Sequence, residues 1–193
     1  MEVTMRSVGE AVRGMALAFI LLAALLFPGA AISAGPGESE VKAAFILNFI
    51  KFVEWPSTAF RSAGEPILLT LVGEDPLADS IEGLDGKTVS GRKVVVRRAA
   101  DLASLERCHV LVVGVSERSE VAPILGAAKR WPVLTVANFE GFAGQGGTIG
   151  FIRLDDRVGF EINEESARKA GLKINPKMLY LGRSIHERKG VER

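Results

Sequence analysis

The sequence predicts an α/β fold of three layers (α/β/α), with a mostly parallel central sheet and an antiparallel C-terminal hairpin at its edge. Three observations carry this prediction. Apolar runs of strand length alternate with helical stretches between residues 67 and 136, which is typical of β-α-β units. The run at residues 67–72 is almost continuously apolar, as in a strand buried on both faces. A hairpin pattern follows at residues 148–162.

A helix is predicted first, over residues 38–54. At 100° per residue, seven of its apolar side chains fall on one broad arc, with polar side chains opposite. Pro56 disfavours helical geometry at the residue before it, so the helix should end near Glu54. Three phenylalanines, with Trp55 just beyond, need a large apolar surface to pack against. We therefore expect this helix to cover one face of the sheet.

The central elements follow in alternation. Asp75 is a suitable N-cap with Pro76 at the first helical position, and Asp101 is a suitable cap for the next helix. Asp85-Gly86 and Ser90-Gly91 are turn signals. The predicted strands are 67–72, 93–97, 110–113 and 133–136, and the predicted helices are 76–84, 101–107 and 116–129.

The C-terminal part changes character. A glycine-rich loop at residues 138–147 precedes two strands that flank Asp155-Asp156, which is a hairpin signal. A helix should begin at Asn163 or Glu164 and end before Gly171. A last helix should begin at Pro176 and reach Ile185, followed by a charged tail.

Residues 1–34 have the pattern of a secretory signal peptide. Arg6 and Arg13 precede an uncharged apolar stretch from Met15 to Phe27, and small residues follow it. The stretch is short for a membrane span, which needs about 20 apolar residues. We expect cleavage after Ser33 or Ala34, an uncleaved N-terminal anchor being the alternative. Residues 35–193 would then be a single exported domain, with no membrane insertion after cleavage.

Composition excludes several classes of function. The formal net charge is +1, so no large basic field exists for binding nucleic acid. Cys108 is the only cysteine, so no intramolecular disulfide can form. Two histidines and one cysteine without ligand spacing give no nucleus for a metal site. We expect no metal and no cofactor.

Catalytic residues are not predicted either. Ser116 lies in Val-Gly-Val-Ser-Glu, which is not a nucleophile elbow. Of the two histidines, His109 borders a buried strand and His186 lies in the last helix or the tail. The loop 141–147 contains four glycines but precedes a strand, whereas phosphate-binding glycine motifs precede a helix. A need for positive φ angles explains these glycines better. We expect a protein that is not an enzyme.

Two groups of residues are candidates for binding. Arg153, Glu161, Ile162 and Asn163 lie around the hairpin and are candidate partner contacts. An Asn163 helix cap with a solvent-facing Glu161 is the favoured explanation of part of this pattern.

Trp55, Phe139 and Phe142 are candidate ligand contacts. Open α/β sheets bind ligands at the carboxyl ends of their strands, where the loops after Val72, Val113 and Val136 should meet. For Trp55, a place in the core is the favoured alternative.

The segment from Val41 to Pro56 is followed by a series of shorter motifs, which are 72–76, 108–111, 133–136, 146–151, 160–163 and 170–172. The first segment is similar to the N-terminal signature of the YfiR-like family of periplasmic proteins, and the shorter motifs resemble that family in the same order over nearly the whole mature chain. The resemblance implies a periplasmic location.

This resemblance implies a regulator without catalytic activity. In the best-known case, the family protein binds the periplasmic sensor region of an inner-membrane diguanylate cyclase and holds it inactive, which limits cyclic di-GMP and biofilm formation. Other members serve other membrane sensors, and members tend to form homodimers. The alternative is a periplasmic small-molecule-binding protein that feeds a sensor kinase or a transporter.

One departure concerns disulfides. The resemblance implies a cysteine partner for Cys108 in the first strand, but Thr70 stands where it is expected, and residues 138–162 contain no cysteine. Redox control by an intramolecular disulfide is therefore excluded. An intermolecular bridge through Cys108 and an inert buried thiol stay open as alternatives.

Overall fold

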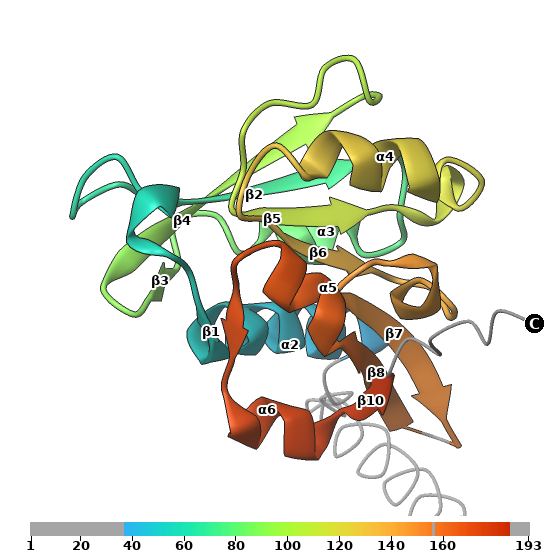
Figure 1. Cartoon of the computed structure of the whole chain (residues 1–193). Helices are drawn as coiled ribbons and strands as arrows, with labels where there is room; N and C mark the ends of the chain where they lie inside the picture. Colours follow the sequence, from blue (N-terminus) through green and yellow to red (C-terminus); the bar gives the residue numbers. More distant parts are fainter. Residues whose placement is uncertain (1–36, 156, 186–193) are drawn as a thin grey trace, which may run out of the picture. The chain divides into compact units, whose positions relative to one another are not determined.

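The structure is a computed structural model that describes residues 37–155 and 157–185, all within one compact unit (Figure 1). The predicted signal peptide, residues 1–34, and the charged tail from residue 186 lie outside the described residues. Both stay predictions.

The central sheet has eight strands within the described residues, in the order β10-β8-β7-β6-β5-β2-β4-β3. The five neighbours β4-β2-β5-β6-β7 are all parallel, and β8 runs antiparallel to β7. The predicted fold class is therefore confirmed. The strands are β2 (Ile67–Val72), β3 (Thr88–Val89), β4 (Arg92–Ala99), β5 (Val110–Val113), β6 (Leu134–Ala137), β7 (Ile149–Leu154), β8 (Arg157–Asn163) and β10 (Arg183–Ile185).

Helices cover both faces of this sheet (Figure 1). α2 and α3 pack on the face that carries Leu69 and Val112, and α4 packs on the face that carries Leu111 and Val113. A separate two-stranded ladder joins β1 (Val53–Glu54) to β9 (Lys173–Ile174). The helices are α2 (Glu38–Phe52), α3 (Ala78–Glu82), α4 (Val121–Ala128), α5 (Glu164–Lys169) and α6 (Pro176–Leu181), with short 3-10 turns η1 (Ser57–Ala59), η2 (Val115–Glu117) and η3 (Ala143–Gln145).

The first helix, α2, packs as the periodicity predicts. Its residues Ile46, Phe49 and Ile50 are fully buried against the sheet. The ring centroid of Phe49 lies 4.8 Å from that of Phe160 on β8, in an edge-to-face arrangement. Aromatic pairs of this geometry add to the free energy gained from apolar burial. The helix therefore ties the N-terminal segment to the C-terminal hairpin.

The helix predicted at residues 101–107 is absent, and this prediction was wrong. The segment forms a turn in which Asp101 Oδ1 accepts a hydrogen bond from Ser104 N, at 2.9 Å. Side chains such as Asp and Ser offer the backbone an alternative to helical hydrogen bonds, and a helix of seven residues gains little by itself.

The helix predicted at residues 116–129 is also corrected, because it divides into η2 and α4. α4 begins at Val121, which places Pro123 in its first turn, where a missing backbone N–H costs nothing. A helix begun at Ser116 would place this proline in the interior.

The last predicted helix is shorter than expected. α6 ends at Leu181, and Arg183–Ile185 form β10, which pairs in parallel with β8. Gly182 permits this change, because a Cβ atom at that position would lie 2.6 Å from the Phe160 ring. The short β10 is thereby added to the outer side of the predicted hairpin.

Candidate functional site

A cavity of about 640 Å³ opens at the carboxyl ends of β6 and β7. Its walls come from three places: the first turns of α2, the segments that follow β5 and β6, and the end of the β7–β8 hairpin. Cavities that bind small molecules in proteins have similar volumes, about 300–1,000 Å³. The lining residues are Glu38, Val41, Lys42, Arg118, Asn138, Phe139, Glu140, Phe151, Ile152, Arg153, Arg157 and Val158.

A chain of hydrogen bonds forms the polar part of the cavity wall. Lys42 Nζ donates to Asn138 Oδ1 at 2.7 Å, and Asn138 Nδ2 donates to Asp75 Oδ1 at 3.0 Å. Asp75 is buried and also accepts from the backbone N–H groups of Leu77, at 2.8 Å, and Val115, at 3.1 Å. One buried carboxylate therefore positions the Asn138 amide at the end of β6.

Glu38 completes this group from the start of α2. Its carboxylate lies 2.5 Å from Lys42 Nζ. The hydrogen bond and the charge of Lys42, with a further contribution from Arg153, hold the pKa of Glu38 below its ordinary value. Glu38 therefore stays ionised at neutral pH and neutralises Lys42.

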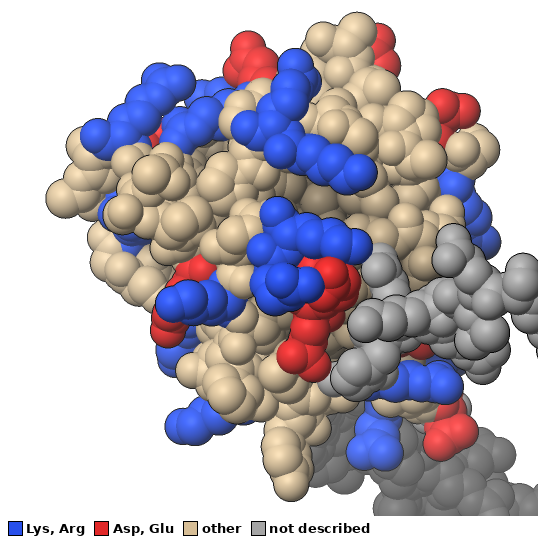
Figure 2. All heavy atoms as spheres, viewed as in Figure 1, with Lys and Arg blue, Asp and Glu red and all other residues tan. Residues whose placement is uncertain are grey.

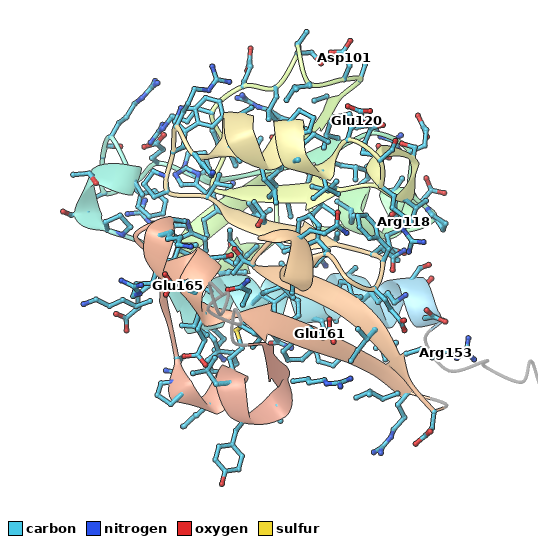
Figure 3. All side chains as sticks on the ribbon, turned by 45° about the vertical axis from the view of Figure 1, so that its right-hand side comes forward. Asp101, Arg118, Glu120, Arg153, Glu161 and Glu165 are labelled. Atoms are coloured by element: carbon cyan, nitrogen blue, oxygen red, sulfur yellow. The ribbon has the colours of Figure 1, made fainter. Side chains whose placement is uncertain are left out.

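Two arginines reach the cavity from opposite elements. The guanidinium carbon of Arg118 lies 4.9 Å from the ring centroid of Phe139, which is a cation–π contact. Arg153, at the end of β7, donates from Nε to the carbonyl oxygen of Asp155 at 3.3 Å. Figure 3 shows both side chains on the same side of the molecule. Neither arginine has a carboxylate within 4.0 Å among the described residues.

The crevice between β2 and β5 is closed. In a strand order of this kind, ligands bind at the point where the order reverses, which here lies between these two strands. The loops that follow them are joined instead: Glu74 N donates to Ser116 Oγ at 2.9 Å, and Ser116 N donates to Glu74 O at 3.3 Å. The open space is therefore displaced to β6 and β7.

A second hollow of about 340 Å³ lies between α4 and α5 and is visible in Figure 2. Trp131 and Val133 form part of its apolar wall, and Lys129 and Lys169 lie at it from the two helices. Its floor holds Thr135, whose Oγ1 accepts from Thr148 N at 2.8 Å. The polar groups of this floor satisfy each other.

The amino end of the parallel strands holds a packed cluster around His109. Leu68 N donates to His109 Nδ1 at 3.0 Å, so Nε2 carries the proton and donates to Ala59 O at 3.0 Å. The ring of Phe60 stacks on the imidazole with centroids 4.4 Å apart. Burial, with the nearby charges of Arg107 and Arg92, lowers the pKa of His109. His109 is therefore neutral and structural.

Cys108 is buried beside this cluster. Burial raises the pKa of its thiol to about 12, although a hydrogen bond with the Thr70 side chain opposes the shift. The thiolate is the reactive form of cysteine. A buried thiol that stays protonated agrees with the inert alternative considered from the sequence.

The four candidate partner contacts do not form one surface. Ile162 and Asn163 are fully buried. Asn163 Oδ1 accepts from Ser166 N at 2.9 Å and thereby caps α5, which is the structural alternative raised from the sequence. Glu161 is half-buried and lies 3.8 Å from Arg183 of β10, whereas Arg153 lies at the cavity. Of these four residues, only Glu161 and Arg153 are therefore still candidates for direct contact with a partner.

The three candidate ligand contacts are also separated. Phe139 lines the cavity. Phe142 is fully buried in the core under α4, and Trp55 packs against the core on the other face. Trp55 contacts Phe60 edge-to-face with centroids 6.4 Å apart. Of the three aromatic residues, only Phe139 is placed where a ligand in this cavity would meet it.

Several residues of interest were not singled out from the sequence. Asn138 and Arg118 line the cavity, but no motif marks them. Lys42 also lines it, and the signature from Val41 to Pro56 that contains Lys42 does not indicate this role. Tyr180 and Leu181 on α6 are 95% and 71% exposed. The sequence pattern counts Leu181 among the apolar residues of the last helix. In the structure α6 ends at this residue, and its side chain is exposed to solvent.

The serine and the histidine that the sequence offers as nucleophile and base lie apart in the structure. Ser116 follows β5 and His109 precedes it, so the two lie at opposite ends of one strand. No cluster of three or more His, Cys, Asp or Glu that could hold a metal occurs between residues 37 and 185 as described. In the same part of the chain, no helix is long and apolar enough to cross a membrane.

The strand order and the cavity define an α/β domain of the flavodoxin-like type with a ligand-sized opening at its carboxyl edge. The chain belongs to the YfiR/HmsC-like family, whose profile matches residues 39–183. This is a family of periplasmic regulators associated with cyclic di-GMP signalling and with partner membrane signalling proteins.

A solved structure has a similar fold. It is the crystal structure of a conserved domain protein from Vibrio cholerae O1 biovar El Tor, with a TM-score of 0.52 and 13% sequence identity. The match covers 76% of this chain and 59% of that one, so this chain spans about three fifths of the length of its relative. At this identity, the likeness shows the fold alone.

Proposed function

We propose that this protein is a non-catalytic periplasmic regulator that binds the periplasmic sensor region of an inner-membrane diguanylate cyclase and holds the cyclase inactive. The observation that carries the proposal is membership of the YfiR/HmsC-like family over residues 39–183. The secretory pattern predicted at residues 1–34 supports it, because export would bring the chain to the compartment of such a sensor region.

The contact surface that we propose is α6 with the adjoining edge of the sheet. Tyr180 and Leu181 project from α6, and large exposed apolar side chains that lie together are typical of protein interfaces. β10 begins just after α6 and pairs with β8 at Glu161, a residue already indicated by the sequence. Arg153 stays a predicted contact at a separate place. Formation of a homodimer also stays a prediction.

A membrane pull-down tests this proposal. The tagged full-length chain should recover an inner-membrane protein with a periplasmic sensor domain, and deletion of the gene should raise cyclic di-GMP. The double variant Tyr180→Ser/Leu181→Ser should fold and recover at least about ten-fold less partner, since truncation of an interface hot spot, for which tyrosine is a favoured residue, costs about 2 kcal/mol or more. The matched control is Val115→Ser, which removes another exposed apolar side chain.

Two results would count against the proposal. Recovery of no membrane protein, together with unchanged cyclic di-GMP after deletion, would overturn the regulatory function. Equal recovery by the double variant and by Val115→Ser would leave the function standing and remove α6 from the contact surface.

The cavity favours a second candidate, a periplasmic small-molecule-binding protein that feeds a sensor kinase or a transporter. The pull-down distinguishes the two, because the partner recovered would then be a kinase or a transport protein.

A further inference from the structure

The cavity at the carboxyl ends of β6 and β7 has an excess of positive charge. Four basic side chains line it, and only two acidic ones do: Lys42, Arg118, Arg153 and Arg157 against Glu38 and Glu140. An opening lined mostly by one sign of charge concentrates small ions of the opposite sign.

Both acidic groups are already engaged. Glu38 is bound to Lys42 at 2.5 Å, and Glu140 Oε1 accepts from the backbone N–H of Arg153 at 3.3 Å. Within the described residues, the guanidinium groups of Arg118 and Arg153 have no carboxylate within 4.0 Å. Guanidinium groups bind carboxylates and phosphates through paired hydrogen bonds. These two arginines are therefore available to an anion.

The remaining wall is apolar and well ordered by packing. Phe139 and Phe151 are buried in the protein at 4% and 2% exposure, and Ile152 lies beside them. Arg118 rests against the Phe139 ring, which fixes its charge next to this wall. A ligand that satisfies the arginines and covers this wall needs an anionic group and an apolar body.

The polar part of the cavity wall is positioned before a ligand binds. The Asn138 amide donates to Asp75 and accepts from Lys42, so it is held in place before any ligand arrives. A site whose groups are positioned in advance loses less conformational entropy on binding. The site is thus organised by contacts that a ligand does not have to supply.

We propose that this cavity binds a small organic anion, with a carboxylate or phosphate group at Arg118 and Arg153 and an apolar body against Phe139 and Phe151. The inference does not depend on the partner proposed above, because it concerns the cavity alone. A ligand bound here would lie against the first turns of α2 and the hairpin.

Titration calorimetry with matched probes tests the proposal on the purified protein. Phenyl phosphate and phenylacetate carry the two anionic groups on one aromatic body, and 2-phenylethanol and phenethylamine are the neutral and cationic matches. At least one anionic probe should bind, at least ten-fold more tightly than the neutral and cationic probes. It should also bind at least ten-fold more tightly than inorganic phosphate or acetate alone.

The double variant Arg118→Gln/Arg153→Gln should weaken binding of that probe by at least ten-fold while keeping its thermal unfolding midpoint. The matched control is Arg98→Gln, which changes an exposed arginine of β4 that pairs with Glu82. The comparison of the two anionic probes decides between a carboxylate and a phosphate. The proposal is overturned if neither anionic probe binds, if the neutral probe binds equally well, or if the double variant binds like the control.

Discussion

At the amino end of the parallel strands, Arg107 binds the Glu65 carboxylate at 2.8 Å and the Ala59 carbonyl, and His109 is hydrogen-bonded through both ring nitrogens. At the carboxyl end, Arg118 and Arg153 face a cavity without a carboxylate partner among the described residues. Arginines thus occur at both ends of the parallel strands. Arg107 at the amino end is paired with a carboxylate, whereas Arg118 and Arg153 at the carboxyl end are available to a ligand.

We infer from this difference that the amino end of the sheet contributes to stability and that the arginines at its carboxyl end contribute to binding. The paired groups at the amino end fasten the segment before β2 to the sheet, because Arg92 also donates to the Glu65 carbonyl oxygen, at 2.6 Å. At the carboxyl end, the buried carboxylate of Asp75 accepts hydrogen bonds from the loops that follow the strands. Arg118 and Arg153 take no part in these hydrogen bonds. A change at the amino end should therefore alter stability, and a change among the arginines at the carboxyl end should alter binding.

The largest effect is expected from Asp75→Ala, which removes the support of the carboxyl end. The backbone N–H groups of Leu77 and Val115 and the Asn138 amide would lose their acceptor. Buried donors left without partners should lower the free energy of unfolding by about 3 kcal/mol. Urea unfolding measures this loss. The neighbouring Glu74→Ala, whose side chain is exposed, should change stability by less than about 0.5 kcal/mol. Similar losses in both variants would contradict the role given to Asp75.

A smaller effect is expected from pH at the amino end. The fold lowers the pKa of His109 from its ordinary value of 6.5 through burial and the charges of Arg107 and Arg92. The hydrogen bond to the Ala59 carbonyl and the charge of Glu65 oppose this shift. The unfolded chain therefore takes up the proton first as pH falls. Stability should decline below about pH 6.5, until the folded protein is also protonated.

Thermal unfolding across pH 5–8 would measure this dependence. In His109→Gln the decline below pH 6.5 should become shallower, although the midpoint at pH 7 is itself lower. An identical pH profile in the variant would show that His109 does not carry the dependence.

The sequence predicted α2 and the strands of four or more residues well, because continuous apolar runs and a 3.6-residue period depend on local composition. The two-residue strands β1, β3 and β9 were not predicted. The prediction failed at residues 101–107, where Asp101 and Ser104 support a helix and a turn equally. It also failed at β10, since Ile185 fits a helix or a strand, and the choice depends on how closely Gly182 approaches Phe160. Long-range contacts of this kind leave no local signal.

The candidate site was predictable in place but not in detail. The parallel topology points to the loops at the carboxyl ends, and Phe139 was identified there. Phe142 was placed with it because both belong to one loop, but the sequence does not show that its ring turns into the core. Arg118 was missed because an arginine near the start of a helix usually faces solvent without further role.

The division of roles between the two ends of the sheet is tested most directly in two variants, Arg107→Gln and Arg153→Gln. The thermal unfolding midpoint and the affinity for an anion are measured for both. The anion is whichever of phenyl phosphate and phenylacetate binds the wild-type protein more tightly. Arg107→Gln should lower the midpoint and leave the affinity for this anion unchanged. Arg153→Gln should keep the midpoint and weaken that affinity by about ten-fold, as expected for the loss of a charged hydrogen bond. If both variants change the same property, or if Arg153→Gln binds as tightly as the wild-type protein, the division of roles between the two ends is wrong.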